Sequence, residues 1–155
     1  MKTQWKKLII SILIPLAIGG LSAFITRDSM ASFAEINKPP LSPPAWLFPV
    51  VWTVLYVMMG IASYIVSTSG YPARARTALT VYGIQLGFNF LWSIIFFNFE
   101  NYLFAFIWLV ILWALILLTT VLFYRINKWA GYLMIPYLLW VTFAGYLNLA
   151  IYFLN

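Results

Sequence analysis

The feature that most constrains this chain is a series of five apolar stretches, each long enough to cross a lipid bilayer as a helix. Such a helix needs about 20 predominantly apolar residues. The stretches cover residues 8–26, 46–68, 79–98, 102–124 and 129–154, and none contains Asp, Glu, Lys, Arg or His. A chain inside lipid must pair its own backbone polar groups, and the alternating pattern of a membrane barrel is absent. The sequence therefore predicts an all-α fold, an integral membrane bundle of five transmembrane helices.

The composition indicates one membrane domain over residues 1–155. Hydrophobic residues make up 65% of the chain and charged residues 8%, whereas soluble domains are about half apolar and about a quarter charged. The chain has no Cys and no His, which removes the commonest ligands of metals and haem and the usual acid–base catalyst. We expect no metal site and no cofactor. Ion-driven transport is disfavoured, because coupled transporters keep an ionisable residue inside the membrane.

The first stretch has two interpretations. Lys2, Lys6 and Lys7 precede it, as basic residues precede the apolar core of a secretory signal peptide. Its length and the lack of a small-x-small cleavage motif favour a span that is retained.

Basic residues gather on one side of the predicted bundle. Seven of the nine lie before the first span, after the second or after the fourth: Lys2, Lys6, Lys7, Arg74, Arg76, Arg125 and Lys128. The positive-inside rule places that side in the cytoplasm. We therefore expect a multi-pass protein of the cell membrane, with a cytoplasmic N-terminus and with the C-terminus and first loop outside. The basic residues are too scattered for a nucleic-acid partner, so the net charge of +6 reflects this bias.

Aromatic and amide side chains recur at helical spacing in three of the spans. They are Gln85, Asn89, Trp92 and Phe96 in the third, Tyr137, Trp140, Ala144 and Asn148 in the fifth, and Trp52 and Tyr56 in the second. Residues three and four apart share a helix face, and amides are costly in lipid, so these faces should point inward. They would form a slot for a flat apolar ligand with a few polar groups. The alternative is packing alone, with amides joining helices and tryptophans anchoring the interfaces.

Gly83 and Gly87 lie on the opposite face of the third span. Small residues at this spacing let two helices approach closely. We expect a homodimer seam here, and the alternative is a helix contact within one chain.

A proline-rich segment, residues 37–46, connects the first two spans. Its prolines and the aromatic residue that ends it are Pro39, Pro40, Pro43, Pro44 and Trp46. Prolines hold a loop in one shape without regular hydrogen bonding, which lowers the ordering cost of binding. We expect a preformed lid over the slot, and the alternative is a plain rigid turn.

Three motifs in this order carry a resemblance to a known family. They are the run KPPLSPPAW followed by Trp52 and Tyr56, then Gln85, Asn89 and Trp92, then Pro136, Tyr137, Trp140, Ala144 and Asn148. The chain resembles, over nearly its whole length, the translocator protein family of tryptophan-rich sensory proteins (TspO/MBR).

The resemblance implies a pocket under the first loop. In the family it binds tetrapyrroles such as protoporphyrin, and synthetic benzodiazepine-site ligands. Bacterial members are associated with light-dependent breakdown of protoporphyrin. Carried over residue by residue, the pocket comprises Trp52, Asn89, Trp92, Trp140, Ala144 and Asn148. The resemblance gives Trp52 and Trp140 the photochemical role.

Three functions follow as hypotheses. The first is a membrane receptor or sensor for tetrapyrroles that also promotes their light-dependent oxidation. The second is a passive carrier of porphyrins or similar planar molecules. The third, an enzyme with a dedicated catalytic constellation, is weakest, because no acid–base pair, metal set or activated nucleophile can be assembled.

Overall fold

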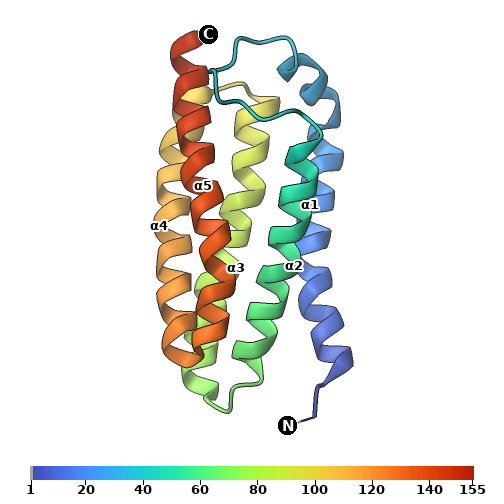
Figure 1. Ribbon diagram of the computed structural model, residues 1–155, viewed down its shortest axis with the longest axis vertical. Helices are drawn as coiled ribbons and strands as arrows, with labels where there is room; N and C mark the ends of the chain where they lie inside the picture. The colour runs from blue at the N-terminus through green and yellow to red at the C-terminus, as the bar shows by residue number, and fades with distance from the viewer. Residues whose placement is uncertain (1) are drawn as a thin grey trace.

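The computed structural model describes residues 2–155, with all of their side chains except those of residues 31 and 32 (Figure 1). The elements are α1 (Trp5–Phe33), α2 (Leu47–Ser67), α3 (Pro72–Ser93), the π-helix η1 (Ile94–Asn98), α4 (Tyr102–Ile126) and α5 (Lys128–Leu154). Five helical stretches are long and apolar enough to cross a membrane, and none of the described residues forms a strand. The predicted all-α, multi-pass membrane bundle is confirmed.

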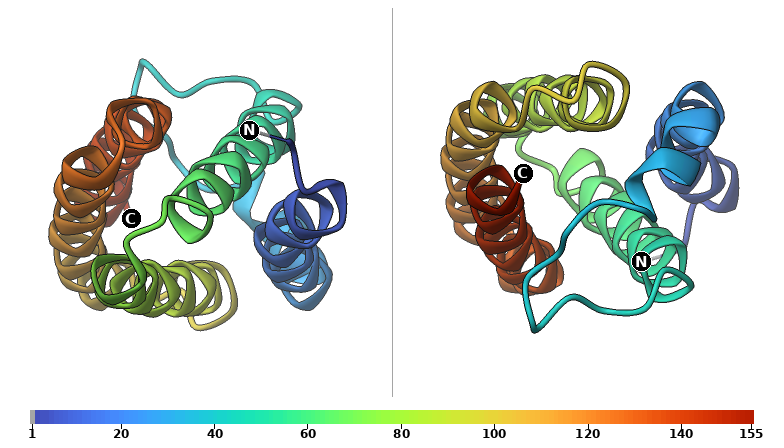
Figure 2. Two further views of the ribbon diagram at one scale, coloured as in Figure 1. Left: turned by 90° about the horizontal axis from the view of Figure 1, so that it is seen from below. Right: turned by 90° about the horizontal axis from the view of Figure 1, so that it is seen from above.

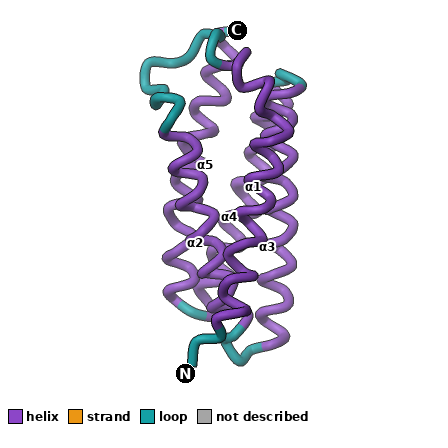
Figure 3. Tube along the Cα trace, turned by 90° about the vertical axis from the view of Figure 1, so that its right-hand side faces the viewer, coloured by secondary structure: helices purple, strands orange, loops and turns teal. Residues whose placement is uncertain are grey.

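The helices stand side by side in a closed ring. Viewed along the bundle, the order around the ring is α1, α2, α5, α4 and α3 (Figure 2). The N-terminal segment and the short α2–α3 and α4–α5 loops lie at one end, which we name the basic end because it holds the seven basic residues identified above. The first loop and the last turn of α5 lie at the other end, which we name the lid end (Figure 3).

Two helices extend well beyond their predicted spans. α1 runs from Trp5 to Phe33, and α3 begins at Pro72, seven residues before the apolar stretch. Pro72 occupies the first helical turn, where its missing N–H would have no partner in any case. The extra turns carry exposed charged side chains such as Arg74 and Arg76. Apolar length therefore marks the membrane core of each helix, not its ends.

Asparagine side chains begin the last two helices. The Asn101 side chain accepts a hydrogen bond from the backbone N–H of Phe104 (3.2 Å), and that of Asn127 accepts one from Trp129 (2.9 Å). These caps satisfy donors that the first turn of a helix leaves unpaired. Two short connections thereby hold α3, α4 and α5 in antiparallel contact.

At Gly60 the backbones of α1 and α2 meet directly. A methyl group added there would lie 2.5 Å from Ile12 Cα and 2.7 Å from the Ser11 carbonyl oxygen. Only glycine allows this approach. The basic half of the bundle is solid around it, with Met59, Val66 and Met134 fully buried. The lid half is not filled in this way.

Candidate ligand-binding cavity

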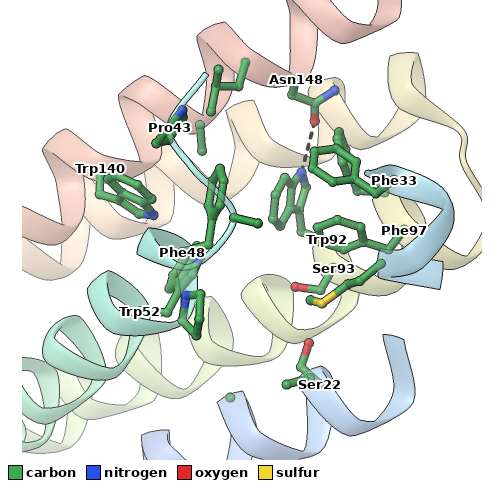
Figure 4. Close-up of a pocket in the computed structure, with 18 of the residues that line it drawn as sticks. Ser22, Phe33, Pro43, Phe48, Trp52, Trp92, Ser93, Phe97, Trp140 and Asn148 are labelled. Atoms are coloured by element: carbon green, nitrogen blue, oxygen red, sulfur yellow. Dashed lines mark hydrogen bonds between the residues drawn. The ribbon is translucent and has the colours of Figure 1, made fainter. Parts of the chain in front are cut away.

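A cavity of about 710 Å³ occupies the lid half of the bundle (Figure 4). Side chains from α1, α2, α3, η1, α5 and the first loop line it, and most of them are apolar. Small-molecule sites commonly have roughly 300–1,000 Å³ and this kind of lining. Gly20 and Ala23 of α1 and Thr53 of α2 are lining residues that remain exposed. The cavity therefore opens sideways along α1 and α2, toward the lipid.

Three tryptophans from three helices form the aromatic wall of this cavity. Trp52 on α2 stacks on Tyr56, with ring centroids 5.5 Å apart, and Trp140 on α5 meets the Phe48 ring edge-on at 5.9 Å. Trp92 on α3 is the third. Within the described part of the chain, the indole N–H groups of Trp52 and Trp140 have no hydrogen-bond partner. Both remain available to a polar group of a ligand.

Trp92 is held in one orientation. Its indole N–H donates to Asn148 Oδ1 (3.1 Å), and Asn148 Nδ2 donates to the carbonyl oxygen of Tyr102 (2.8 Å). Phe96 stacks on the indole with centroids 5.2 Å apart. Asn148 therefore joins α3, α4 and α5, and it also lines the cavity together with Ala144.

Asn89 and Tyr137 lie beneath the cavity and do not line it. Asn89 Nδ2 donates to the Tyr137 hydroxyl (2.8 Å), which in turn donates to Gln85 Oε1 (2.6 Å). The Tyr56 hydroxyl, at the cavity floor, donates to Asn89 Oδ1 (3.4 Å). These buried groups join α2, α3 and α5, so Gln85 and Asn89 have the helix-joining contacts of the packing interpretation. They support the floor through Tyr56.

The first loop lies across the lid end and contributes Lys38, Ser42, Pro43 and Ala45 to the lining. Of the residues predicted for the lid, Pro43 faces the cavity. Pro39 is buried elsewhere, whereas Pro40, Pro44 and Trp46 are exposed. The loop is tied to α5, because Asn155 Nδ2 donates to the Asn37 carbonyl oxygen (2.9 Å) and Asn37 N–H donates to Asn155 Oδ1 (3.2 Å).

Comparison with known proteins shows the family of this chain. The sequence model of the TspO/MBR family matches residues 11–154. The chain belongs to the TspO/MBR family. It is 43% identical to "Tryptophan-rich protein TspO" of Archaeoglobus fulgidus, over 96% of this chain and 97% of that protein. It is 36% identical to "Tryptophan-rich sensory protein" of Cereibacter sphaeroides (75% and 72%) and 31% identical to "Translocator protein" of Bos taurus (96% and 89%).

Gly83 and Gly87 of this TspO/MBR chain lie on the outer face of α3. Both are exposed, and a methyl group added at either would meet no atom within 4 Å. Ile84 and Leu91 extend the same exposed helix surface. Among the described residues, neither glycine is therefore packed closely against another helix.

Several cavity residues of the TspO/MBR chain were not predicted. The main ones are Phe33, Lys38, Phe48 and Phe97. Phe97 packs edge-on against Phe33 and Phe96, at centroid distances of 5.2 and 4.9 Å. In a continuous α-helix, at 100° per residue, Phe97 would lie on the outer face with Gly83 and Gly87. The π-helix explains the difference, because its wider turn rotates the chain and directs two adjacent phenylalanines inward.

Proposed function

We propose that this protein is a membrane receptor or sensor that binds tetrapyrroles of the protoporphyrin type in the cavity of the lid half. The observation that supports it best is the cavity itself: about 710 Å³, walled by Trp52, Trp92 and Trp140, and covered by a proline-rich loop. Flat aromatic walls suit a flat aromatic ring system. A relative named for a sensory role, the Cereibacter sphaeroides protein, supports the receptor assignment. Synthetic benzodiazepine-site ligands would occupy the same space.

The test is a binding titration in nanodiscs with one cavity residue enlarged. Ala144→Leu adds volume at a lining position and should weaken protoporphyrin binding by at least tenfold. Gly145→Ala is the matched control, because its added methyl group would meet Leu109 at an ordinary 3.6 Å on the side toward α4. Equal affinity of the two variants and the parent would place the porphyrin outside this cavity. A benzodiazepine-site ligand should compete with the porphyrin.

We also propose that bound porphyrin is consumed in light. The excited ring would take one electron from an indole, leaving a porphyrin radical anion and an indole radical cation, with dissolved dioxygen as the oxidant for loss of the ring. Trp52 and Trp140 suit the donor role, since each lines the cavity through an electron-rich ring whose N–H is not engaged in the described part of the chain. The protein supplies orientation and electrons, and the light supplies the energy.

The packing of the basic half favours reception over passage. The lining residues of α2 and α5 end at Tyr56 and Trp140, and below them Met59, Phe123 and Met134 are fully buried. In the described part of the chain, these side chains fill the interior of the basic half, which disfavours passage of a porphyrin through the bundle. We expect sealed vesicles containing only this protein to show no more porphyrin uptake than empty vesicles. Protein-dependent uptake would instead support a passive carrier.

Finally, we propose a homodimer formed through the outer face of α3. Gly83 and Gly87 leave a shallow, apolar surface on which a second helix can pack closely. This face points away from the cavity, so the dimer and the binding site are structurally independent.

A further inference from the structure

Among the described residues that line the cavity, Lys38 alone carries a charge. It lies where α1 passes into the lid loop, and it is half-buried. Its ammonium donates to the carbonyl oxygens of Ala34 (3.1 Å) and Ile36 (3.4 Å), and lies 4.9 Å from the centroid of the Phe33 ring. The charge is therefore held at one place at the top of the cavity.

This charge is positioned but not neutralised. An ammonium has three N–H donors, and the two carbonyls use two of them. Within residues 2–155, one ion pair is formed, between Arg27 and Asp28. In the same residues, Lys38 has no carboxylate partner. A cation next to an apolar space attracts an anion more strongly than it would in water, because the local dielectric constant is lower. The structure thus offers an incoming ligand one preplaced positive charge.

Ser42 gives an independent indication of a ligand with hydrogen-bond acceptors. It lines the same cavity from the lid, and its Oγ is buried with no partner among the described residues. Buried hydroxyls are normally satisfied, so an unpaired one beside a cavity calls for a partner supplied from outside the chain. A carboxylate can accept hydrogen bonds from both an ammonium and a hydroxyl.

We infer that Lys38 selects ligands with a carboxylate on one edge and orients that edge toward the lid, with the apolar part of the ring against the tryptophans. This inference rests on the proposed function and specifies its ligand. Protoporphyrin has the required form, because both propionates lie on one edge of the macrocycle. Lys38 is thus a specificity residue, and its two carbonyl contacts place the ammonium.

The test compares protoporphyrin IX with its dimethyl ester, which keeps the ring and removes both charges. Both are titrated by Soret absorbance into the full chain in zwitterionic nanodiscs, with empty nanodiscs as the blank. We expect the parent to prefer the acid. Lys38→Gln should weaken acid binding at least tenfold, the scale of one charge-assisted hydrogen bond, and change ester binding less than about twofold. Lys38→Arg should retain the preference.

Arg27→Gln is the matched control. It removes a cation from the same end of α1, outside the cavity lining, and should leave both affinities unchanged. If Lys38→Gln weakens acid and ester equally, Lys38 only anchors the end of α1 and the inference is overturned. Equal binding of both porphyrins by the parent protein also overturns the inference about Lys38, and this result does not require the variant to fold. It leaves the proposed function intact. Binding of neither porphyrin would overturn the proposed function itself.

Discussion

The tryptophans of the cavity differ in how firmly they are held. Trp92 donates a hydrogen bond to Asn148, which is itself bonded to Tyr102, whereas Trp52 and Trp140 contact mainly other aromatic rings. The Trp92 indole therefore joins helices as well as lining the cavity. Trp52 and Trp140 have no such hydrogen bond, so substituting them disturbs the fold less. They are therefore the better positions at which to separate binding from photochemistry.

Replacing Trp52 and Trp140 by Phe should preserve binding and slow photobleaching. Phe keeps an aromatic face, so affinity for protoporphyrin should fall by no more than about 1 kcal/mol per site. Phenylalanine is much harder to oxidise than indole, so bleaching under constant illumination should slow sharply, most of all in the double variant. Trp113→Phe is the control, since Trp113 bonds to Thr142 outside the cavity lining. Bleaching of the double variant at the parental rate would assign the chemistry to the porphyrin alone.

At the scale of single residues, the sequence predicted which helix faces point inward, but not how far along the bundle each residue lies from the cavity. Helical spacing identifies a face, and it grouped Asn89 with Trp92 and Tyr137 with Trp140. It does not tell how far along the bundle a void begins, so Asn89 and Tyr137 were predicted as lining residues and lie in the buried network below. Lys38 belongs to the proline-rich motif, but its contact with the cavity depends on how α1 ends, which composition does not reveal.

At the scale of single elements, the direct approach of the α1 and α2 backbones depends on Gly60. Gly60→Ala should destabilise the protein by about 1–3 kcal/mol, the usual cost of overpacking, because the added methyl group meets backbone atoms that cannot rotate away. The change would be measured as thermal stability in detergent. Gly145→Ala is the matched control: its methyl group would meet Leu109 at an ordinary 3.6 Å, and alanine favours the helix by up to about 1 kcal/mol. Equal stability of the two variants would contradict the close contact.

The five helices could be predicted because a membrane requires apolar length, which is read directly from composition. The π-helix could not. Nothing in the residues Ile94–Asn98 distinguishes a wide turn from an ordinary one, and the packing of η1 against α1 and α4 cannot be read from the sequence. Its effect is local but important for the site, because it changes the direction of Phe97 and completes the aromatic wall beside Phe33.

For the whole molecule, the exposed glycines predict a dimer that can be separated from ligand binding. Gly83→Leu or Gly87→Leu should shift the protein toward monomer, because a large side chain prevents close helix approach. Protoporphyrin affinity should stay within about twofold, since neither residue lines the cavity. Stepwise photobleaching of labelled protein in bilayers would count the subunits. If both variants remain dimeric, the seam lies on another face.

The orientation in the membrane can be tested because the chain has no native cysteine. Leu41→Cys places a thiol on the exposed part of the lid loop, and Ala73→Cys places one beside Arg74 at the basic end. The positive-inside rule predicts that an impermeant maleimide labels only the first in intact cells and both after permeabilisation. The reverse pattern would mean that the lid faces the cytoplasm.

The contact at Gly60 also holds α1 close to α2 near the basic end of the bundle. Ile12 lies at this contact, and Met30 at the cavity lies about 27 Å further along the helix axis, at 1.5 Å per residue. A tilt of about 5° around that point would move the Met30 end by roughly 2 Å and the Trp5 end by about 1 Å. The far end is restrained by exposed contacts, such as the hydrogen bond from Ser29 Oγ to Asn98 Oδ1 (2.6 Å). A change in the tilt of α1 at its basic end would therefore change the width of the cavity at the lid end.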